Sequence, residues 1–140
     1  MRTRHPSVAA DIGPGFPVAE ARALQTALEG ALTAVERAAG RPVPVELRFE
    51  PGAGPGVVVV CRNRVVGFVP PDRAPGLRGQ LADAGRRAHL VAPGVLHRQD
   101  GLWRAWAGAE PEDGVPPAPD GLDTMAAPDP AVLGIPLRRG

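Results

Sequence analysis

The chain contains no lysine and no tyrosine, and Ser7 and Cys61 are its only serine and its only cysteine. Without lysine, neither a Schiff base nor the lysine of a phosphate-binding P-loop can form. A single cysteine excludes an internal disulfide, which is typical of a reducing compartment, and we therefore expect a cytoplasmic location. No segment approaches the roughly 18 consecutive apolar residues of a membrane helix, so no membrane partner is expected.

Groups that perform catalysis are equally scarce. A catalytic nucleophile needs a base within hydrogen-bond reach, but Ser7 precedes the predicted fold and Cys61 ends an apolar strand, where a thiol packs as a small hydrophobe. His5, His89 and His97 include no i, i+4 pair, and no carboxylate completes a metal-binding set. We predict no catalytic residue, metal or cofactor. An enzyme remains the alternative only if a histidine lies beside a carboxylate in a substrate-sized pocket.

Charge is distributed unevenly along the chain. All 16 cationic residues are arginine. Residues 41–108 hold ten arginines against five acidic residues, a net charge of +5, whereas residues 109–140 hold six acidic residues against two arginines, a net charge of −4. A basic body with an acidic tail is typical of proteins with a polyanionic partner. A solvated surface and a codon bias towards arginine are the simpler explanation.

The N-terminal part of the chain predicts a leader followed by one long helix. Residues 1–16 have no periodicity and are expected to be flexible. From 17 to 39, apolar residues recur every three or four positions, which predicts a helix with one apolar stripe. Pro17 suits its first turn and Gly40 its end. The stripe is expected to cover the protein's own sheet, or a partner helix or second copy of the chain. Its leucines are Leu24, Leu28 and Leu32.

Between residues 43 and 108 the apolar period changes to two, which predicts about five short strands. Two hairpins are expected. One turns at Arg62-Asn63, where asparagine tolerates the left-handed backbone of a tight turn. The other turns at Asp100-Gly101, a dipeptide typical of such turns.

A short helix is predicted to begin at Asp72 and to end at Gly85. These elements give an α+β fold: a small curved antiparallel β-sheet or partly open barrel, one long N-terminal helix and one short helix. Residues 17–108 form its single domain, with the helix at 17–39 and the β body at 43–108. The remaining residues, 109–140, are acidic and rich in proline, which predicts a disordered tail.

Nucleic-acid binding is the function hypothesis with the most specific residues. Single strands are held by planar side chains that stack on bases and by cations that contact phosphates. Four arginines flank the two hairpin turns and are expected to line one rim, while two aromatic residues are expected to stack. Trp103 and Trp106 lie three apart in a strand and face opposite sides, so at most one is expected in the core. The alternative is that the aromatic residues only fill a core. The candidate residues are Arg62, Arg64, Arg98 and Arg104 for phosphates, and Phe68 and Trp106 for bases.

The segment "LRFEPG…VVVVCRNRVVGFVPPDRAPGLRGQL" resembles the HIRAN and HIRAN-like domains over about residues 44–108. The most specific part is Val66-Gly67-Phe68-Val69-Pro70, followed by Asp72 and Ala74. The resemblance implies a small barrel-like domain, and members attached to DNA-remodelling enzymes grip single-stranded DNA ends. It also implies that Phe68 contributes a ring to that grip. The family's Asn-Pro-Tyr-Asp stretch is replaced here by residues 52–56, "GAGPG", so its tyrosine and aspartate have no counterpart.

A protein-interaction module is the competing hypothesis. A partner would then dock on the helix stripe formed by Leu24, Leu28 and Leu32, or on the C-terminal segment 131–139, with the body as a scaffold. In that segment the apolar contacts would come from Leu133, Ile135 and Leu137. Deleting residues 109–140 should strengthen nucleic-acid binding by removing a net charge of −4, but should abolish a partnership made through the tail.

Overall fold

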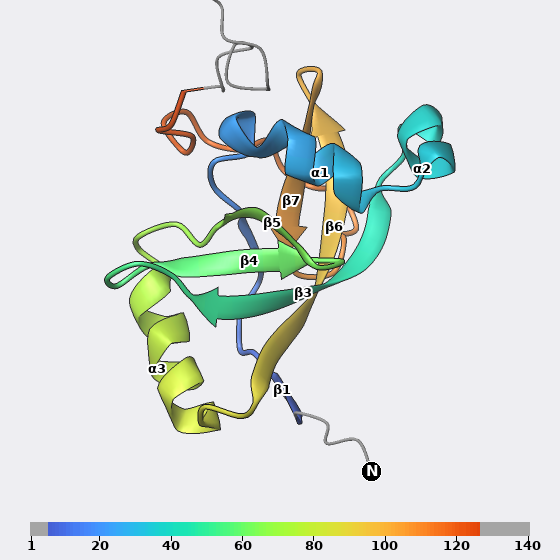
Figure 1. Ribbon diagram of the computed structural model, residues 1–140. Helices are drawn as coiled ribbons and strands as arrows, with labels where there is room; N and C mark the ends of the chain where they lie inside the picture. The colour runs from blue at the N-terminus through green and yellow to red at the C-terminus, as the bar shows by residue number, and fades with distance from the viewer. Residues whose placement is uncertain (1–5, 127–140) are drawn as a thin grey trace, which may run out of the picture.

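A computed structural model describes residues 6–126, which form an α+β fold (Figure 1). No helix in this range combines the length and the apolar character needed to cross a membrane. The elements are β1 (Ser7–Ala9), β2 (Phe16–Pro17), the 3-10 helix η1 (Arg22–Leu24), α1 (Gln25–Ala31), α2 (Ala34–Ala39), β3 (Val43–Pro51), β4 (Val57–Cys61), β5 (Arg64–Phe68), α3 (Ala74–Ala84), β6 (His89–Gln99) and β7 (Leu102–Ala107).

The strands form one curled sheet in the order β2-β7-β6-β3-β4-β5, with β1 added in parallel to the start of β6. Within β3 to β7, each strand is antiparallel to the one it pairs with, as their alternating apolar pattern predicts. Figure 1 shows β3 and β4 crossing the direction of β6 and β7, which gives the sheet the shape of a half-barrel. The predicted α+β class with a small curved antiparallel sheet is confirmed.

Residues 16–19 join the two edges of this sheet. Phe16 and Pro17 pair with β7, and Ala19 exchanges two backbone hydrogen bonds of 2.8 and 3.1 Å with Phe68 of β5. Residues 6–16 are therefore part of the fold, and the prediction of a flexible leader is wrong for them. Strands of two and three residues leave no periodicity to detect, which is why the sequence did not indicate them. Residues 1–5 lie outside the described range.

Gly67 allows the joining segment to cross β5 closely. A Cβ atom on Gly67 would lie 2.7 Å from the carbonyl oxygen of Ala19 and closer still to the side chain of Val18, which is itself buried. Real Cβ atoms do not approach other atoms this closely, so only glycine fits here without a shift. The glycine of the Val-Gly-Phe motif thus has a packing reason in this chain.

The predicted helix of residues 17–39 is divided into three short pieces. The backbone of Leu32 is extended, with φ −100° and ψ 147°, and Thr33 starts a new helix with a capping box. In this box the Thr33 hydroxyl accepts the backbone N–H of Glu36 at 3.1 Å, and the Glu36 carboxylate accepts the N–H of Thr33 at 2.9 Å. The apolar spacing continues across the break, so periodicity alone did not reveal it.

The leucine stripe covers the protein's own sheet, which was the first of the three surfaces considered for it, before a partner helix and a second copy of the chain. Leu28 is 0% and Leu32 4% exposed, and both belong to the core between the helices and the inner face of the sheet. Leu24 is half-buried. Leu28 and Leu32 therefore offer no surface to a partner, and the partner-binding role predicted for them is wrong.

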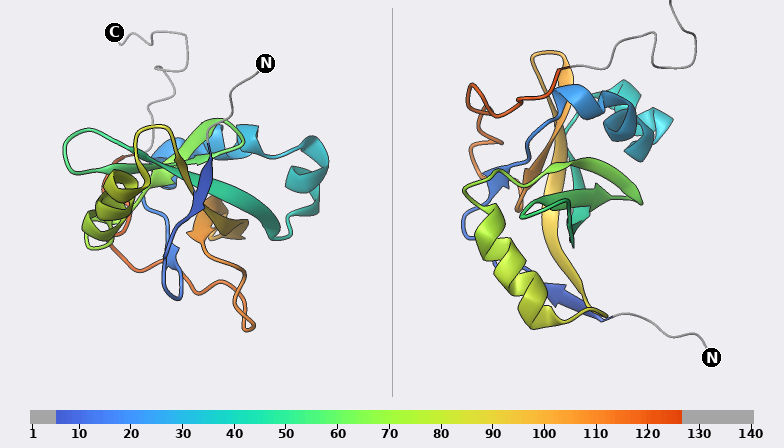
Figure 2. Two further views of the ribbon diagram at one scale, coloured as in Figure 1. Left: turned by 90° about the horizontal axis from the view of Figure 1, so that it is seen from below. Right: turned by 60° about the vertical axis from the view of Figure 1, so that its left-hand side comes forward.

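Part of the predicted tail packs against the body. Residues 109–126, called the strap below, run back from the end of β7 to the start of η1 (Figure 2). The prediction of a disordered tail does not hold for the strap, because a few polar side chains attach it. Residues 127–140, with the candidate contacts Leu133, Ile135 and Leu137, lie outside the described range.

We predict that Gly67→Ala lowers the free energy of unfolding by about 1–3 kcal/mol, the usual cost of an extra methyl group in a packed site. Gly79→Ala is the matched control, since a Cβ atom there meets nothing within 4 Å and alanine favours the interior of α3. Urea denaturation followed by tryptophan fluorescence measures both. Equal stability of the two variants would contradict this account of the closure.

Candidate nucleic-acid interface

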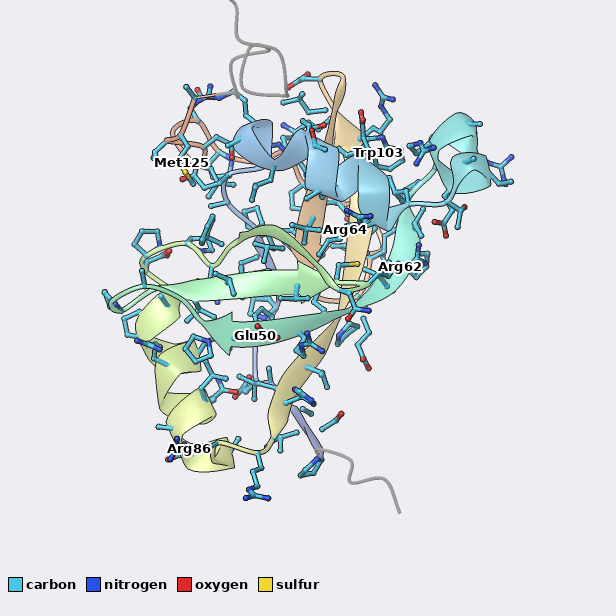
Figure 3. The ribbon with its side chains drawn as sticks, in the orientation of Figure 1. Glu50, Arg62, Arg64, Arg86, Trp103 and Met125 are labelled. Carbon is cyan, nitrogen blue, oxygen red and sulfur yellow. The ribbon has the colours of Figure 1, made fainter. Side chains whose placement is uncertain are left out.

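Arg62 and Arg64 flank the β4–β5 turn, as predicted. Both side chains lie against α1 and α2 (Figure 3). Arg62 has φ 50° and Asn63 φ 67°, the left-handed pair of a type I′ turn. The Arg62 guanidinium forms an ion pair with Glu36 at 2.7 Å. Its hydrogen bond lowers the pKa of Glu36 to about 2. The Arg62 side chain is still 40% exposed, so Arg62 lies at the surface with its guanidinium paired to Glu36.

Arg64 is exposed and extends across α1 at Gly30. A Cβ atom on Gly30 would lie 2.8 Å from the Arg64 Cζ atom, so glycine leaves room for the guanidinium.

Arg98 and Arg104 lie on opposite faces of the β6–β7 hairpin. In the strand register Arg98 is opposite Trp103, and His97 is opposite Arg104. The Arg98 guanidinium lies 5.6 Å from the centre of the Trp103 ring and donates to the Gly101 carbonyl at 3.1 Å. The four predicted arginines therefore do not line one rim: two lie at the β4–β5 turn, and the other two are separated by the sheet.

Arg104 and Trp106 share the outer face of β7, which confirms their predicted side of the strand. Both tryptophans are buried, with Trp103 2% and Trp106 6% exposed. Trp103 belongs to the core cluster and Trp106 does not, as the expectation that at most one of them lies in the core has it. The outer face is covered as well as the inner one. Val95, at 1%, and His97, at 8% exposure, are buried on the same outer face.

The Trp106 ring is closed in by two glycines. A Cβ atom on Gly15 would lie 2.8 Å from Trp106 Cζ2, and one on Gly108 would lie 3.2 Å from Trp106 Nε1. Among the described residues, Trp106 Nε1 is the one buried side-chain nitrogen or oxygen without a hydrogen-bond partner. An unpaired buried donor of this kind costs about 1–3 kcal/mol.

Asp123 of the strap is bound by five donors of the body. The Arg104 guanidinium donates to both carboxylate oxygens, at 3.2 and 2.6 Å. The backbone N–H groups of Glu20, Ala21 and Arg22 donate to the same carboxylate at 2.8, 3.2 and 3.2 Å. Glu20 has φ 72°, the left-handed backbone that lets successive N–H groups converge on an anion. The Arg104 guanidinium and these three N–H groups are called the anion site below.

Glu20 binds the strap in return. Its carboxylate accepts the N–H of Thr124 at 2.8 Å, the hydroxyl of Thr124 at 2.6 Å and the N–H of Met125 at 2.8 Å. Arg22 adds hydrogen bonds of 3.0 and 3.2 Å to the Met125 carbonyl. The contacts are therefore reciprocal: backbone N–H groups of residues 20–22 donate to the Asp123 carboxylate, and those of Thr124 and Met125 donate to the Glu20 carboxylate.

The anion site favours negative charge despite being buried. The side chains of Arg104 and Asp123 are 12% and 6% exposed. Burial by itself would raise the pKa of Asp123, but the hydrogen bonds and charge of Arg104, with the N–H groups of Arg22 and Glu20, lower the pKa below its ordinary value. Burial also lowers the pKa of His97, which favours its neutral form.

Phe68 lines a hollow next to the anion site. The hollow has a volume of about 460 Å³ and shares Glu20 with the contacts that hold the strap. Body residues and strap residues form its walls together. They include Phe68, Val69, Pro70 and Pro71 from the body and Pro119, Leu122 and Met125 from the strap. The structure therefore brings Phe68 and Arg104 to the same side of the molecule.

Sequence reasoning missed Glu20, Arg22 and Asp123, although they organise this side of the protein. Asp123 is one of several acidic residues in a proline-rich stretch and has no distinguishing pattern. Glu20 has a positive φ, which no sequence rule assigns to glutamate. Across residues 6–126, no three His, Cys, Asp or Glu side chains gather in a way that could hold a metal ion.

We predict that Asp123→Asn releases the strap, because Arg104 then loses the charge that compensates its burial. Removing one partner of a buried ion pair costs about 3–5 kcal/mol, and the partial exposure of Arg104 places the loss near the lower value. Hydrogen exchange at the amides of Glu20 and Ala21 should accelerate. Asp120→Asn, the same charge change at an exposed strap position, should leave both amides protected. Equal protection in both variants would rule out Asp123 as the anchor.

Comparison with protein-family profiles, with curated proteins and with solved structures finds no match to this chain. The function is therefore inferred from the geometry of residues 6–126 and from the resemblance carried by residues 44–108.

Proposed function

We propose that this chain is a non-enzymatic domain that binds single-stranded nucleic acid on the outer face of β6 and β7. The observation that carries the proposal is the anion site: the Arg104 guanidinium and three convergent backbone N–H groups already hold a carboxylate, next to a tryptophan on the same strand face. Single-strand binding requires this combination of a cation for phosphate and an aromatic ring for a base.

A phosphate group fits the donors that hold Asp123. Arginine donates two parallel N–H groups, which match two oxygens of a carboxylate or of a phosphate equally well. Successive backbone N–H groups of the kind at Glu20, Ala21 and Arg22 are a recurring phosphate-binding arrangement. Arg22 lies at the same place and supplies a second guanidinium.

An aromatic ring that a base can use lies beside that phosphate position. Trp106 is two residues beyond Arg104, so the two side chains stand on the same face about 7 Å apart along the strand. One nucleotide spans such a distance between its phosphate and its base. Phe68, in the adjoining hollow, supplies a second ring, at the position where the resemblance to HIRAN domains implies an aromatic contact. Stacking on each ring contributes about 1–3 kcal/mol per base.

The charge of the body supports the same partner. Residues 6–108 hold twelve arginines against nine acidic residues, a net charge of +3. A positive body attracts a polyanion, and the attraction weakens as salt increases.

A protein-interaction module is the second candidate, and one observation favours it. Val35 of α2 is 78% exposed, and α2 has no buried residue. This apolar side chain, rather than the buried leucine stripe, is the place where a protein partner would meet the region 17–39.

The test compares two arginine variants in the Asp123→Asn background, where the strap is released in both. Fluorescence anisotropy with an oligothymidylate at two salt concentrations measures binding. Arg104→Gln should weaken it about tenfold and reduce the salt slope by about 0.7, the value for one phosphate contact on a single strand. Arg41→Gln removes the same charge from an exposed side chain that pairs with no acidic group in the described range. Equal effects of both substitutions would contradict the proposed site.

A further inference from the structure

We propose that the strap is an intramolecular competitor for this face, with the carboxylate of Asp123 occupying the anion site in place of a nucleic-acid phosphate. The inference rests on the proposed function and adds its regulation. In the closed state seen here, Arg104 and the three N–H groups are fully engaged by the strap. A single strand and the strap therefore cannot use the anion site together.

The strap is attached at few points and contributes little apolar burial. None of residues 109–126 is buried as a whole. Away from the Asp123 region, the Ala118 N–H donates to the Gln99 side chain at 2.9 Å, and Leu122 lines the hollow. Segments with few buried apolar contacts open at low cost in free energy. Most of the attachment is concentrated in Asp123 and Glu20, so the strap can leave without unfolding the sheet.

The closed state leaves one group unsatisfied. Trp106 is 6% exposed, yet its Nε1–H has no hydrogen-bond partner in the described range. The ring lies on the same face as Arg104, and the segment that begins at Gly108 leads from it into the strap. The ring is enclosed by Gly15 and Gly108, and a bound strand that reaches it offers this N–H the oxygen acceptor that it lacks in the closed state.

The strap resembles a nucleic acid in charge. It contains five acidic residues and no arginine, a net charge of −5, against +3 for residues 6–108. Exchange of the strap for a nucleic-acid strand keeps an anion at Arg104, so neither state leaves that guanidinium without a counter-charge.

Glu20 sets the balance between the two states. Its carboxylate binds the N–H and hydroxyl of Thr124 and the N–H of Met125, whereas it would repel the phosphate of a nucleic acid. The closed state is therefore favoured in the absence of a ligand. Because the anion site uses the backbone of Glu20 and not its side chain, the two roles can be separated by mutation.

The test measures oligothymidylate binding by the full chain and three variants. Asp123→Asn should bind at least tenfold more tightly than the unaltered chain, because the competing carboxylate is gone. Glu20→Gln should also tighten binding, since it loosens the strap and leaves the anion site unchanged. Asp120→Asn has the same charge as both and keeps the strap attached, so it should bind within about twofold of the unaltered chain.

The outcomes separate the two proposals. If all four proteins bind with equal affinity and binding still requires Arg104, the strap is only structural and the competitor role is overturned while the proposed function stands. If none binds, both fail. Should Asp123→Asn unfold, Glu20→Gln decides between the two by comparison with Asp120→Asn, which carries the same charge change. Equal affinities of these two variants would overturn the competitor role.

Discussion

The carboxylate of Asp123 is the interaction on which this side of the protein depends. Five donors from two segments converge on it, and its partner Arg104 is almost as buried as it is. A buried ion pair of this kind is stable only when its remaining donors and acceptors are satisfied. Here the backbone N–H groups of Glu20, Ala21 and Arg22 supply the remaining donors. The Asp123 carboxylate therefore joins the strap to the start of η1, and the Glu20 carboxylate adds contacts to Thr124 and Met125.

The anion site is built on the seam that closes the half-barrel. Residues 16–19 pair with β7 on one side and with β5 on the other, and Glu20 follows directly. Gly67 lets this segment approach β5, which determines where the N–H groups after Ala19 point. The resemblance to HIRAN domains rests on the same Val-Gly-Phe stretch, so one packing constraint links the fold to the proposed binding face.

The body of the fold could be predicted because its strands β3 to β7 are long enough to show an alternating pattern and their turns have distinctive residues. The short strands β1 and β2 have no such pattern. The helix break at Thr33 is marked by a Thr-x-x-Glu capping box, a signal that apolar spacing conceals.

The candidate site was predicted only in part. The spacing of Arg104 and Trp106 gave their common face correctly, because side chains alternate along a strand. Arg104 is buried against Asp123 of the strap, and nothing in the composition of the strap distinguishes Asp123 from the other acidic residues. The Trp106 ring is enclosed by Gly15 and Gly108, which no alternating pattern indicates. The prediction of a rim of four arginines is wrong because Arg98 and Arg104 lie on opposite faces of the β6–β7 hairpin. Arg62 also pairs with a helix residue 26 positions earlier, a contact that no local pattern contains.

We propose that a single strand takes the anion site that Asp123 of the strap now occupies. The chain has two tryptophans and therefore two indole N–H signals in a nitrogen-15 NMR spectrum, which makes Trp103 an internal control for Trp106. Addition of an oligothymidylate should shift the Trp106 indole signal and the amides of Glu20 to Arg22, and leave the Trp103 indole unchanged. Shifts confined to Trp103 or to the turn at Arg62 and Arg64, with Trp106 unmoved, would contradict the account.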